Sequence, residues 1–160
     1  YNVYSNDGTA IILSAENDQA DLAILRIVGT QPSNDTHPSL KLAYNDEVIT
    51  RGMEVALVGS PQGVQNSISV GVVSQTGITI STWGAGTFIM TDAAINGGNS
   101  GGPMVNSLGN VVGVVESKIV STEIDNMGFA LSVDTLRSFL SWASQAAHNE
   151  LGENLTLALK

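Results

Sequence analysis

The spacing of apolar residues changes once along the chain, near residue 134, and this change constrains the fold. Before it, short β-like runs alternate with turn signals such as Asn6-Asp7-Gly8. The predicted strands cover residues 2–5, 10–14, 21–27, 53–59, 68–74, 87–91, 104–106, 111–115 and 129–133. After it, apolar residues recur at helical spacing over residues 135–148, with Asp134 as the expected N-cap. This order predicts an all-β fold of barrel architecture with one C-terminal α-helix.

Composition limits the partners that the chain is expected to bind. The 160 residues are enough for one domain with a real core. The net charge of −9, with only six Lys and Arg, argues against nucleic acid and anionic membranes, because phosphate binding needs clustered basic residues. No run reaches the length of a membrane span and no signal peptide opens the chain, so no membrane insertion is expected.

Metal and cofactor chemistry is not expected either. The chain has no cysteine, which excludes disulfides and thiolate metal sites. Its two histidines are far apart and the carboxylates are scattered, so no set of side chains has the spacing of metal ligands. We therefore predict no metal and no cofactor.

A serine between glycines marks the candidate site. Residues 91–103 read Thr-Asp-Ala-Ala-Ile-Asn-Gly-Gly-Asn-Ser-Gly-Gly-Pro, with Ser100 as the serine. A hydroxyl attacks a carbonyl well only if a base takes its proton and hydrogen-bond donors hold the oxyanion. Glycines permit sharp turns that aim backbone amides at one point beside the hydroxyl. We expect Ser100 to be a nucleophile and the amides of Gly98 and Ser100 to form an oxyanion hole.

Asp21 is the second candidate, because it opens the apolar run Asp-Leu-Ala-Ile-Leu at residues 21–25. A buried carboxylate that orients an imidazole would complete a Ser-His-Asp set. The alternative is an aspartate that makes only local caps where a strand begins.

Taken together, these segments resemble those of trypsin-like serine proteases, in the HtrA/Deg branch, and they occur in the same order. The resemblance also includes residues 58–63 (Val-Gly-Ser-Pro-Gln-Gly) and 127–131 (Met-Gly-Phe-Ala-Leu), and it spans nearly all of residues 1–147. It implies a two-barrel fold. Residues 1–40 would be the remainder of the first barrel, 41–133 the second barrel, 134–148 the helix and 149–160 a tail.

The same resemblance implies a serine endopeptidase that acts through an acyl-enzyme, with Asp21 as the orienting carboxylate. Extended or unfolded polypeptides would be its substrates, and protein quality control its role. The resemblance also implies that this protein lies in the bacterial periplasm or cell envelope, or is secreted. Relatives of this kind commonly form homo-oligomers, often trimers.

One departure from the family is serious. In the chymotrypsin-type order a His precedes the Asp, yet no His precedes Asp21 here. We expect the catalytic His to lie upstream of Tyr1, which would leave the first barrel incomplete and the 160 residues alone inactive. His37, in a polar stretch, is expected to be a surface residue. The alternative function is a catalytically silent pseudoprotease or a peptide-binding module of the same fold.

A second arrangement uses His148. Ser100, then Asp125 or Asp134, then His148 is the chain order of an α/β-hydrolase. That fold needs a helix immediately after the serine. The glycines and proline at 101–103 are followed instead by a strand-like run, so this arrangement is disfavoured.

Two neighbouring residues shape the expected specificity. In trypsin-like folds the residue six before the nucleophile lies at the base of the primary pocket. Here it is Ala94, which offers no charge to a substrate Lys or Arg, and Ile95 beside it indicates a shallow apolar pocket. We predict cleavage after small or aliphatic residues. Substrate backbone is expected to pair by strand addition with the segment that holds Glu116, Ser117 and Lys118.

Overall fold

The computed structural model describes residues 2–4, 10–27, 39–61, 67–116 and 127–151, and its side chains over 15–25, 39–61, 67–116 and 127–145. The chain divides into two compact units, Tyr1–Ser39 with Ser138–Lys160, and Leu40–Arg137. Along the chain the elements are β1 (Asn2–Tyr4), β2 (Ala10–Asn17), β3 (Leu22–Ile27), β4 (Glu54–Gly59), β5 (Ser67–Ile78), the 3₁₀ turn η2 (Ser81–Trp83), β6 (Phe88–Thr91), β7 (Pro103–Asn106), β8 (Val111–Glu116), β9 (Gly128–Ser132) and α1 (Val133–Leu151).

The first unit contains a three-stranded antiparallel sheet in the order β1-β2-β3. A register shift between Leu13 and Ala15 interrupts the pairing of β2 with β3. Such a bulge bends a strand and increases its local twist. The turn between β2 and β3 carries Asp21.

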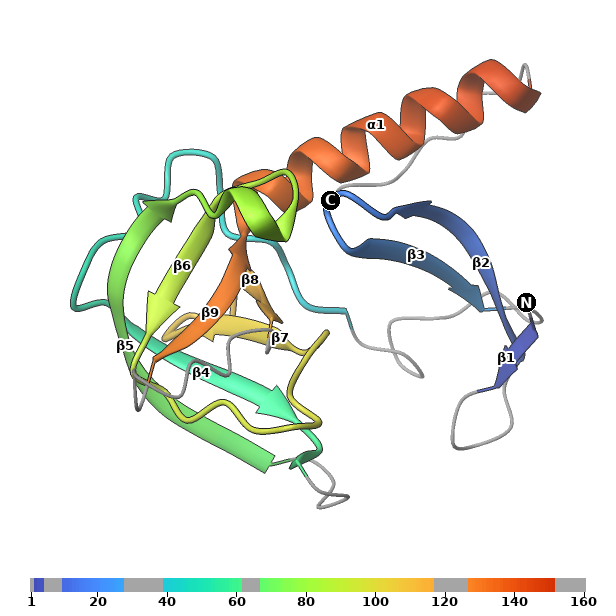
Figure 1. Cartoon of the computed structure of the whole chain (residues 1–160). Helices are drawn as coiled ribbons and strands as arrows, with labels where there is room; N and C mark the ends of the chain where they lie inside the picture. Colours follow the sequence, from blue (N-terminus) through green and yellow to red (C-terminus); the bar gives the residue numbers. More distant parts are fainter. Residues whose placement is uncertain (1, 5–9, 28–38, 62–66, 117–126, 152–160) are drawn as a thin grey trace. The chain divides into compact units, whose positions relative to one another are not determined.

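The second unit is a closed antiparallel barrel with the strand order β4-β5-β6-β9-β8-β7 (Figure 1). Closure pairs both edges of every strand, which removes the open edges that invite aggregation. Alternate residues of the strands point inward and form one core with loop residues from positions 43 and 93. The fully buried members are Ala43, Val55, Leu57, Val73, Ile89, Ala93, Met104, Val112, Val115 and Ala130.

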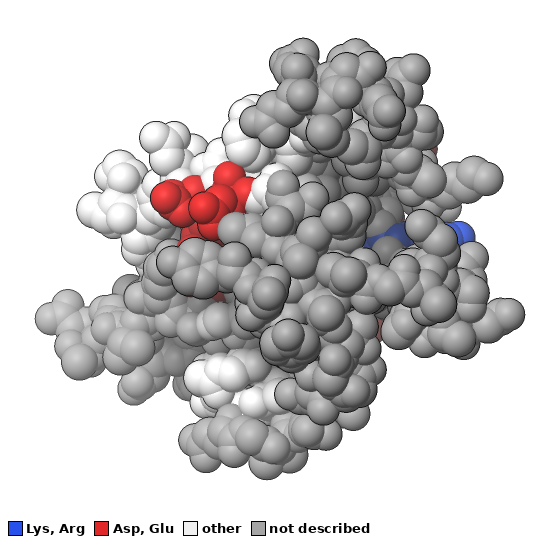
Figure 2. Space-filling view, turned by 90° about the vertical axis from the view of Figure 1, so that its right-hand side faces the viewer, with Lys and Arg blue, Asp and Glu red and all other residues white. Residues whose placement is uncertain are grey.

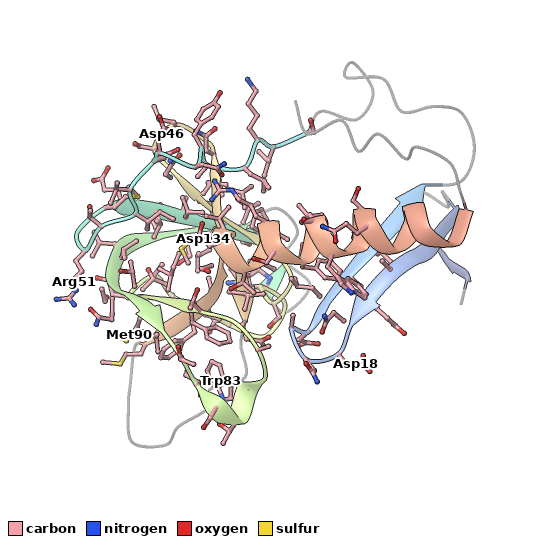
Figure 3. All side chains as sticks on the ribbon, turned by 90° about the horizontal axis from the view of Figure 1, so that it is seen from above. Asp18, Asp46, Arg51, Trp83, Met90 and Asp134 are labelled. Carbon is pink, nitrogen blue, oxygen red and sulfur yellow. The ribbon has the colours of Figure 1, made fainter. Side chains whose placement is uncertain are left out.

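Strand β5 is longer than the sequence predicted, because it continues through polar residues to Ile78. Its pairing with β6 shifts register twice, between Val73 and Gln75 and between Gln75 and Ile78. These irregularities allow the strand to bend around the barrel. Beyond it, the ring of Trp83, labelled at the tip of the η2 turn in Figure 3, makes edge-on contacts with the rings of Phe88 and Phe129.

A buried polar network fixes the segment that leads into the barrel. The Glu47 carboxylate accepts hydrogen bonds from the side-chain amides of Asn106 and of Asn110, the latter at 3.4 Å. Asn106 Oδ1 in turn accepts from the backbone amides of Leu108 and Asn110 at 3.0 and 2.9 Å. Because each of these buried polar groups has a partner, the β7–β8 hairpin and the incoming segment are held in one arrangement.

Helix α1 begins at Val133, two residues before the start expected from the helical spacing at 135–148, and its N-cap is Ser132 rather than Asp134. The Ser132 hydroxyl accepts from the Thr135 amide at 3.3 Å and lies 2.7 Å from the Thr87 hydroxyl. Asp134 lies in the first turn, where its carboxylate accepts from Arg137 at 2.7 Å (Figure 3). The prediction of Asp134 was wrong because the tertiary contact with Thr87 selects the serine as cap.

The architecture is therefore mostly β, with one C-terminal helix, as the sequence predicted. Among the described helices, none is at once long enough and apolar enough to cross a membrane.

Core packing between β4 and β7 can be tested at Met104, which is 0% exposed and pairs with Leu57 across the two strands. Met104→Ala should lower the free energy of unfolding by about 2–5 kcal/mol, because it removes buried atoms and leaves a cavity. Leu108→Ala, at a position 77% exposed in the neighbouring turn, is the control and should change it by less than about 0.5 kcal/mol. Urea unfolding followed by tryptophan fluorescence measures both, and equal effects would contradict this description of the core.

Candidate active site

Four of the predicted site residues lie together in the loop of residues 92–102, which joins β6 to β7. Ala94, Gly98 and Ser100 are exposed, whereas Ile95 is half-buried. The chain enters β7 three residues after the serine, at Pro103, so no helix follows it. This excludes the α/β-hydrolase arrangement for Ser100, which requires a helix directly after the nucleophile.

Hydrogen bonds fix two of the peptide planes around the serine. The Asn99 amide donates to the Asn96 carbonyl at 3.0 Å, and the Gly98 carbonyl accepts from the Ser60 amide at 3.1 Å. The Asn99 carbonyl accepts from the Gly102 amide at 2.9 Å. Since N–H and C=O of a trans peptide point in opposite directions, the Ser100 amide is turned away from Gly102.

The loop approaches the end of β4 so closely that only glycine fits at the contact points. A Cβ on Gly102 would lie 2.3 Å from the Val58 carbonyl oxygen, and one on Gly98 would lie 2.4 Å from that of Ser60. Gly98 also has a φ of 107°, a conformation that L residues with a side chain rarely adopt. Space therefore requires glycine at Gly98 and Gly102, and backbone conformation requires it at Gly98 as well.

Strand β8 is joined to the loop just after the serine. The Gly101 amide donates to the Val115 carbonyl at 2.9 Å, and the Val115 amide donates to the Gly102 carbonyl at 2.8 Å. These two bonds extend the β7–β8 ladder beyond Pro103. They bring the end of β8, where the predicted substrate residue Glu116 lies, beside the loop of Ser100. The other two predicted residues of that segment, Ser117 and Lys118, lie outside the described residues.

The base of the predicted pocket carries no acidic side chain between residues 93 and 102. Ile95 packs against the barrel core and over Gly128 of β9. A Cβ added to Gly128 would lie 2.4 Å from Cδ1 of Ile95. The Ala94 carbonyl accepts a long hydrogen bond, 3.5 Å, from the side-chain amide of Asn99.

Sequence reasoning missed the pair that anchors the start of the loop. Asp92 Oδ1 accepts from the Val72 amide at 2.7 Å, while the Thr91 hydroxyl donates to the Val72 carbonyl at 2.8 Å. The same hydroxyl accepts from the Ala93 amide at 3.1 Å. A threonine at a strand end is a known signal for a local bond such as that between Thr91 and Ala93, whereas the two bonds to Val72 join residues far apart in the chain and carry no local signal.

Asp21 belongs to the unit that contains Tyr1–Ser39. It is the last residue of a turn that is stabilised by Asn17. The side-chain oxygen of Asn17 accepts hydrogen bonds from the backbone amides of Gln19 and Ala20 at 3.0 and 3.1 Å. Asp21 is exposed and has a φ of 51°, which is uncommon for a residue other than glycine. Backbone strain of this kind clusters at functional sites. His37 and Asp125 lie outside the described residues, and so does the side chain of His148.

The molecule carries a formal net charge of −9 at pH 7. Figure 2 shows acidic side chains gathered in one red patch on the face that it presents. A field of this sign repels other polyanions at low ionic strength. Within the described residues, no group of three or more His, Cys, Asp and Glu side chains could hold a metal ion.

Comparison with known proteins agrees with this geometry. A family model described as "Trypsin-like peptidase domain" matches residues 4–114. The chain is 38% identical over 140 residues to the mitochondrial serine protease HTRA2 of Bos taurus, which covers 85% of the chain. It is 30% identical over 177 residues to a probable periplasmic serine endoprotease, DegP-like, of Marinomonas sp., which covers 94% of the chain. Among solved structures, the HtrA-type protease AlgW with a decapeptide matches 89% of the chain with a TM-score of 0.71 and 29% identity.

These relatives are much longer than the chain, which spans 29% of the bovine protein, 37% of the Marinomonas protein and 44% of the AlgW chain. The comparisons therefore apply to the domain rather than to a whole protein. The barrel, the C-terminal helix and the family match confirm the predicted fold class and family resemblance. The chain belongs to the family of trypsin-like peptidase domains and is related to the HtrA/DegP serine proteases.

Proposed function

We propose that this chain supplies the nucleophile of a serine endopeptidase of HtrA/DegP type, with Ser100 in that role. The observation that carries the proposal is the fixed peptide plane between Asn99 and Ser100. Its carbonyl is bonded to the Gly102 amide at 2.9 Å, which turns the Ser100 amide away from Gly102. An amide fixed in this way can stabilise the negative charge that develops in acyl transfer without reorganising during the reaction.

The proposed reaction proceeds through an acyl-enzyme. A histidine from outside the 160 residues takes the Ser100 proton as Oγ attacks the scissile carbonyl, and Asp21 orients that imidazole. The tetrahedral oxyanion is held by the amides of Gly98 and Ser100. Its collapse breaks the C–N bond, the imidazolium gives its proton to the leaving amine, and water then hydrolyses the ester by the same steps.

Substrates of this enzyme are extended polypeptide segments. The link between Val115 and the loop places the end of β8 beside Ser100, so a substrate strand added next to Glu116 would bring its carbonyl to the hydroxyl. The uncharged base at Ala94 supports a preference for small or aliphatic residues before the cut. In this proposal residues 1–40 belong to the first barrel and residues 41–133 form the second.

Cellular placement and assembly follow the relatives. Several DegP-like relatives are described as periplasmic, and the bovine relative is mitochondrial. We place this protein in a bacterial envelope, acting in protein quality control as a homo-oligomer. The second candidate function is a silent peptide-binding module of the same fold, which is supported by the position of the end of β8 beside the loop, where an extended peptide could pair.

A fluorophosphonate probe separates the enzyme from the binding module. The 160-residue chain alone should label at least about a thousandfold more slowly than the same chain extended by its upstream, histidine-bearing segment, because Ser100 lacks its base. Ser100→Ala in the extended protein is the control and should abolish labelling. Fast, Ser100-dependent labelling of the 160 residues alone would contradict the assignment of the base.

Specificity can be tested by changing the base of the pocket. The extended protein should cleave a peptide library after Ala, Val or Leu, whereas Ala94→Asp should raise cleavage after Lys or Arg by about tenfold or more, through a charge-assisted pair. Ala85→Asp adds the same charge at an exposed position away from the loop and should leave the preference unchanged. Preferred cleavage after Arg or Lys by the unmodified protein would contradict the proposed pocket.

A further inference from the structure

Two of the three buried asparagines in the described part of the barrel, Asn99 and Asn106, differ in how their side chains are hydrogen-bonded. Asn106 is 6% exposed. Its side-chain oxygen accepts hydrogen bonds from two backbone amides, and its side-chain nitrogen donates one to the Glu47 carboxylate. Asn99 is 4% exposed, yet its nitrogen makes only the 3.5 Å bond to the Ala94 carbonyl. Its Oδ1 is completely buried and accepts no hydrogen bond from any described residue. Asn99 directly precedes Ser100.

The side chain of Asn99 lies between the loop and the end of β4. A Cβ on Gly59 would lie 2.4 Å from Oδ1, so the oxygen occupies space that only glycine leaves open. Exchanging the side-chain oxygen and nitrogen would place two acceptors, Oδ1 and the Ala94 carbonyl, face to face at 3.5 Å. The hydrogen-bond pattern therefore favours the orientation in which the nitrogen faces Ala94 and the oxygen faces β4.

Asn99 also joins three points of the loop. Its backbone amide binds the Asn96 carbonyl, its backbone carbonyl binds the Gly102 amide, and its side chain reaches Ala94. Movement of Asn99 would change the direction of the Ser100 amide, because the Asn99 carbonyl and the Ser100 amide belong to the same peptide plane.

A buried acceptor without a partner destabilises a fold, and an apolar side chain of the same shape would not carry that penalty. Folds keep such unfavourable groups where activity depends on them. We infer that Asn99 is a positioning residue: its side-chain amide orients the Ser100 loop through the hydrogen bond to the Ala94 carbonyl. The buried side-chain oxygen, which accepts no hydrogen bond from a described residue, lowers the stability of the folded state in return. Its effect on catalysis rests on the proposed function, whereas its effect on the loop does not.

The test compares Asn99→Leu with the matched control Asn106→Leu. Asn99→Leu should melt no lower than the unmodified 160-residue chain, because the unpartnered oxygen is gone. Its loop should nevertheless exchange amide hydrogens about fivefold faster over residues 93–103, the change expected for one lost hydrogen bond. In the extended protein it should slow fluorophosphonate labelling of Ser100 by about tenfold or more, with KM for peptides unchanged. Asn106→Leu should lower the melting temperature, since it breaks a satisfied network, and leave loop exchange and labelling unchanged at temperatures well below melting.

Two results would overturn the inference. One is a melting temperature for Asn99→Leu below that of the unmodified chain, or a variant that does not fold, since the side chain would then be stabilising. The other is unchanged loop exchange in Asn99→Asp, which keeps the shape but turns the donor facing Ala94 into an acceptor. If the extended, unmodified protein does not label, the proposed function fails, and melting and exchange still decide the role of Asn99.

Discussion

The close approach of the Ser100 loop to the end of β4 is the contact on which the site depends. At Gly59, Gly98 and Gly102 the neighbouring atoms are so close that no side chain would fit where the two segments meet. The same contact directs the Gly98 carbonyl to the Ser60 amide, and it holds Gly102 against Val58; within the loop, the Gly102 amide binds the Asn99 carbonyl. Because the carbonyl and the amide of one peptide point in opposite directions, the bond from Gly102 to the Asn99 carbonyl determines the direction of the Ser100 amide. The orientation of the Ser100 amide is thus a consequence of packing against a barrel strand.

The barrel supplies the rigidity that this contact needs. Closure of six strands leaves no free edge on β4, and the Glu47 network holds the incoming segment against the β7–β8 hairpin. Thr91 and Asp92 fix the start of the loop to β5, and Val115 of β8 fixes its end. A loop tied at both ends to strands of one barrel holds its geometry better than a loop anchored at one end.

Much of the fold could be predicted because short apolar runs and turn residues report strands directly. The runs at 53–59, 111–115 and 129–133 correspond closely to β4, β8 and β9. Residues 75–78 were missed because Gln75 and Gly77 break the alternation, and the strand is continued there by bulged pairing with β6. The N-cap was misplaced because Ser132 and Asp134 are both good caps, and only the contact with Thr87 distinguishes them. The glycine-flanked Ser100 could be identified from local sequence, but the burial of Asn99 depends on β4, forty residues away in the chain. The relation of Asp21 to Ser100 stays a prediction.

The most direct measurement compares two glycines of the same loop. A Cβ on Gly102 would meet the Val58 carbonyl oxygen at 2.3 Å, whereas a Cβ on Gly97 would meet nothing within 4 Å. In the protein extended by its histidine-bearing segment, the rate of fluorophosphonate acylation of Ser100 should therefore fall by about a hundredfold or more in Gly102→Ala, the loss expected when an oxyanion donor is misplaced. It should stay within a few-fold of the unmodified rate in Gly97→Ala. Equal rates for the two variants would contradict the claim that contact with β4 sets the direction of the Ser100 amide.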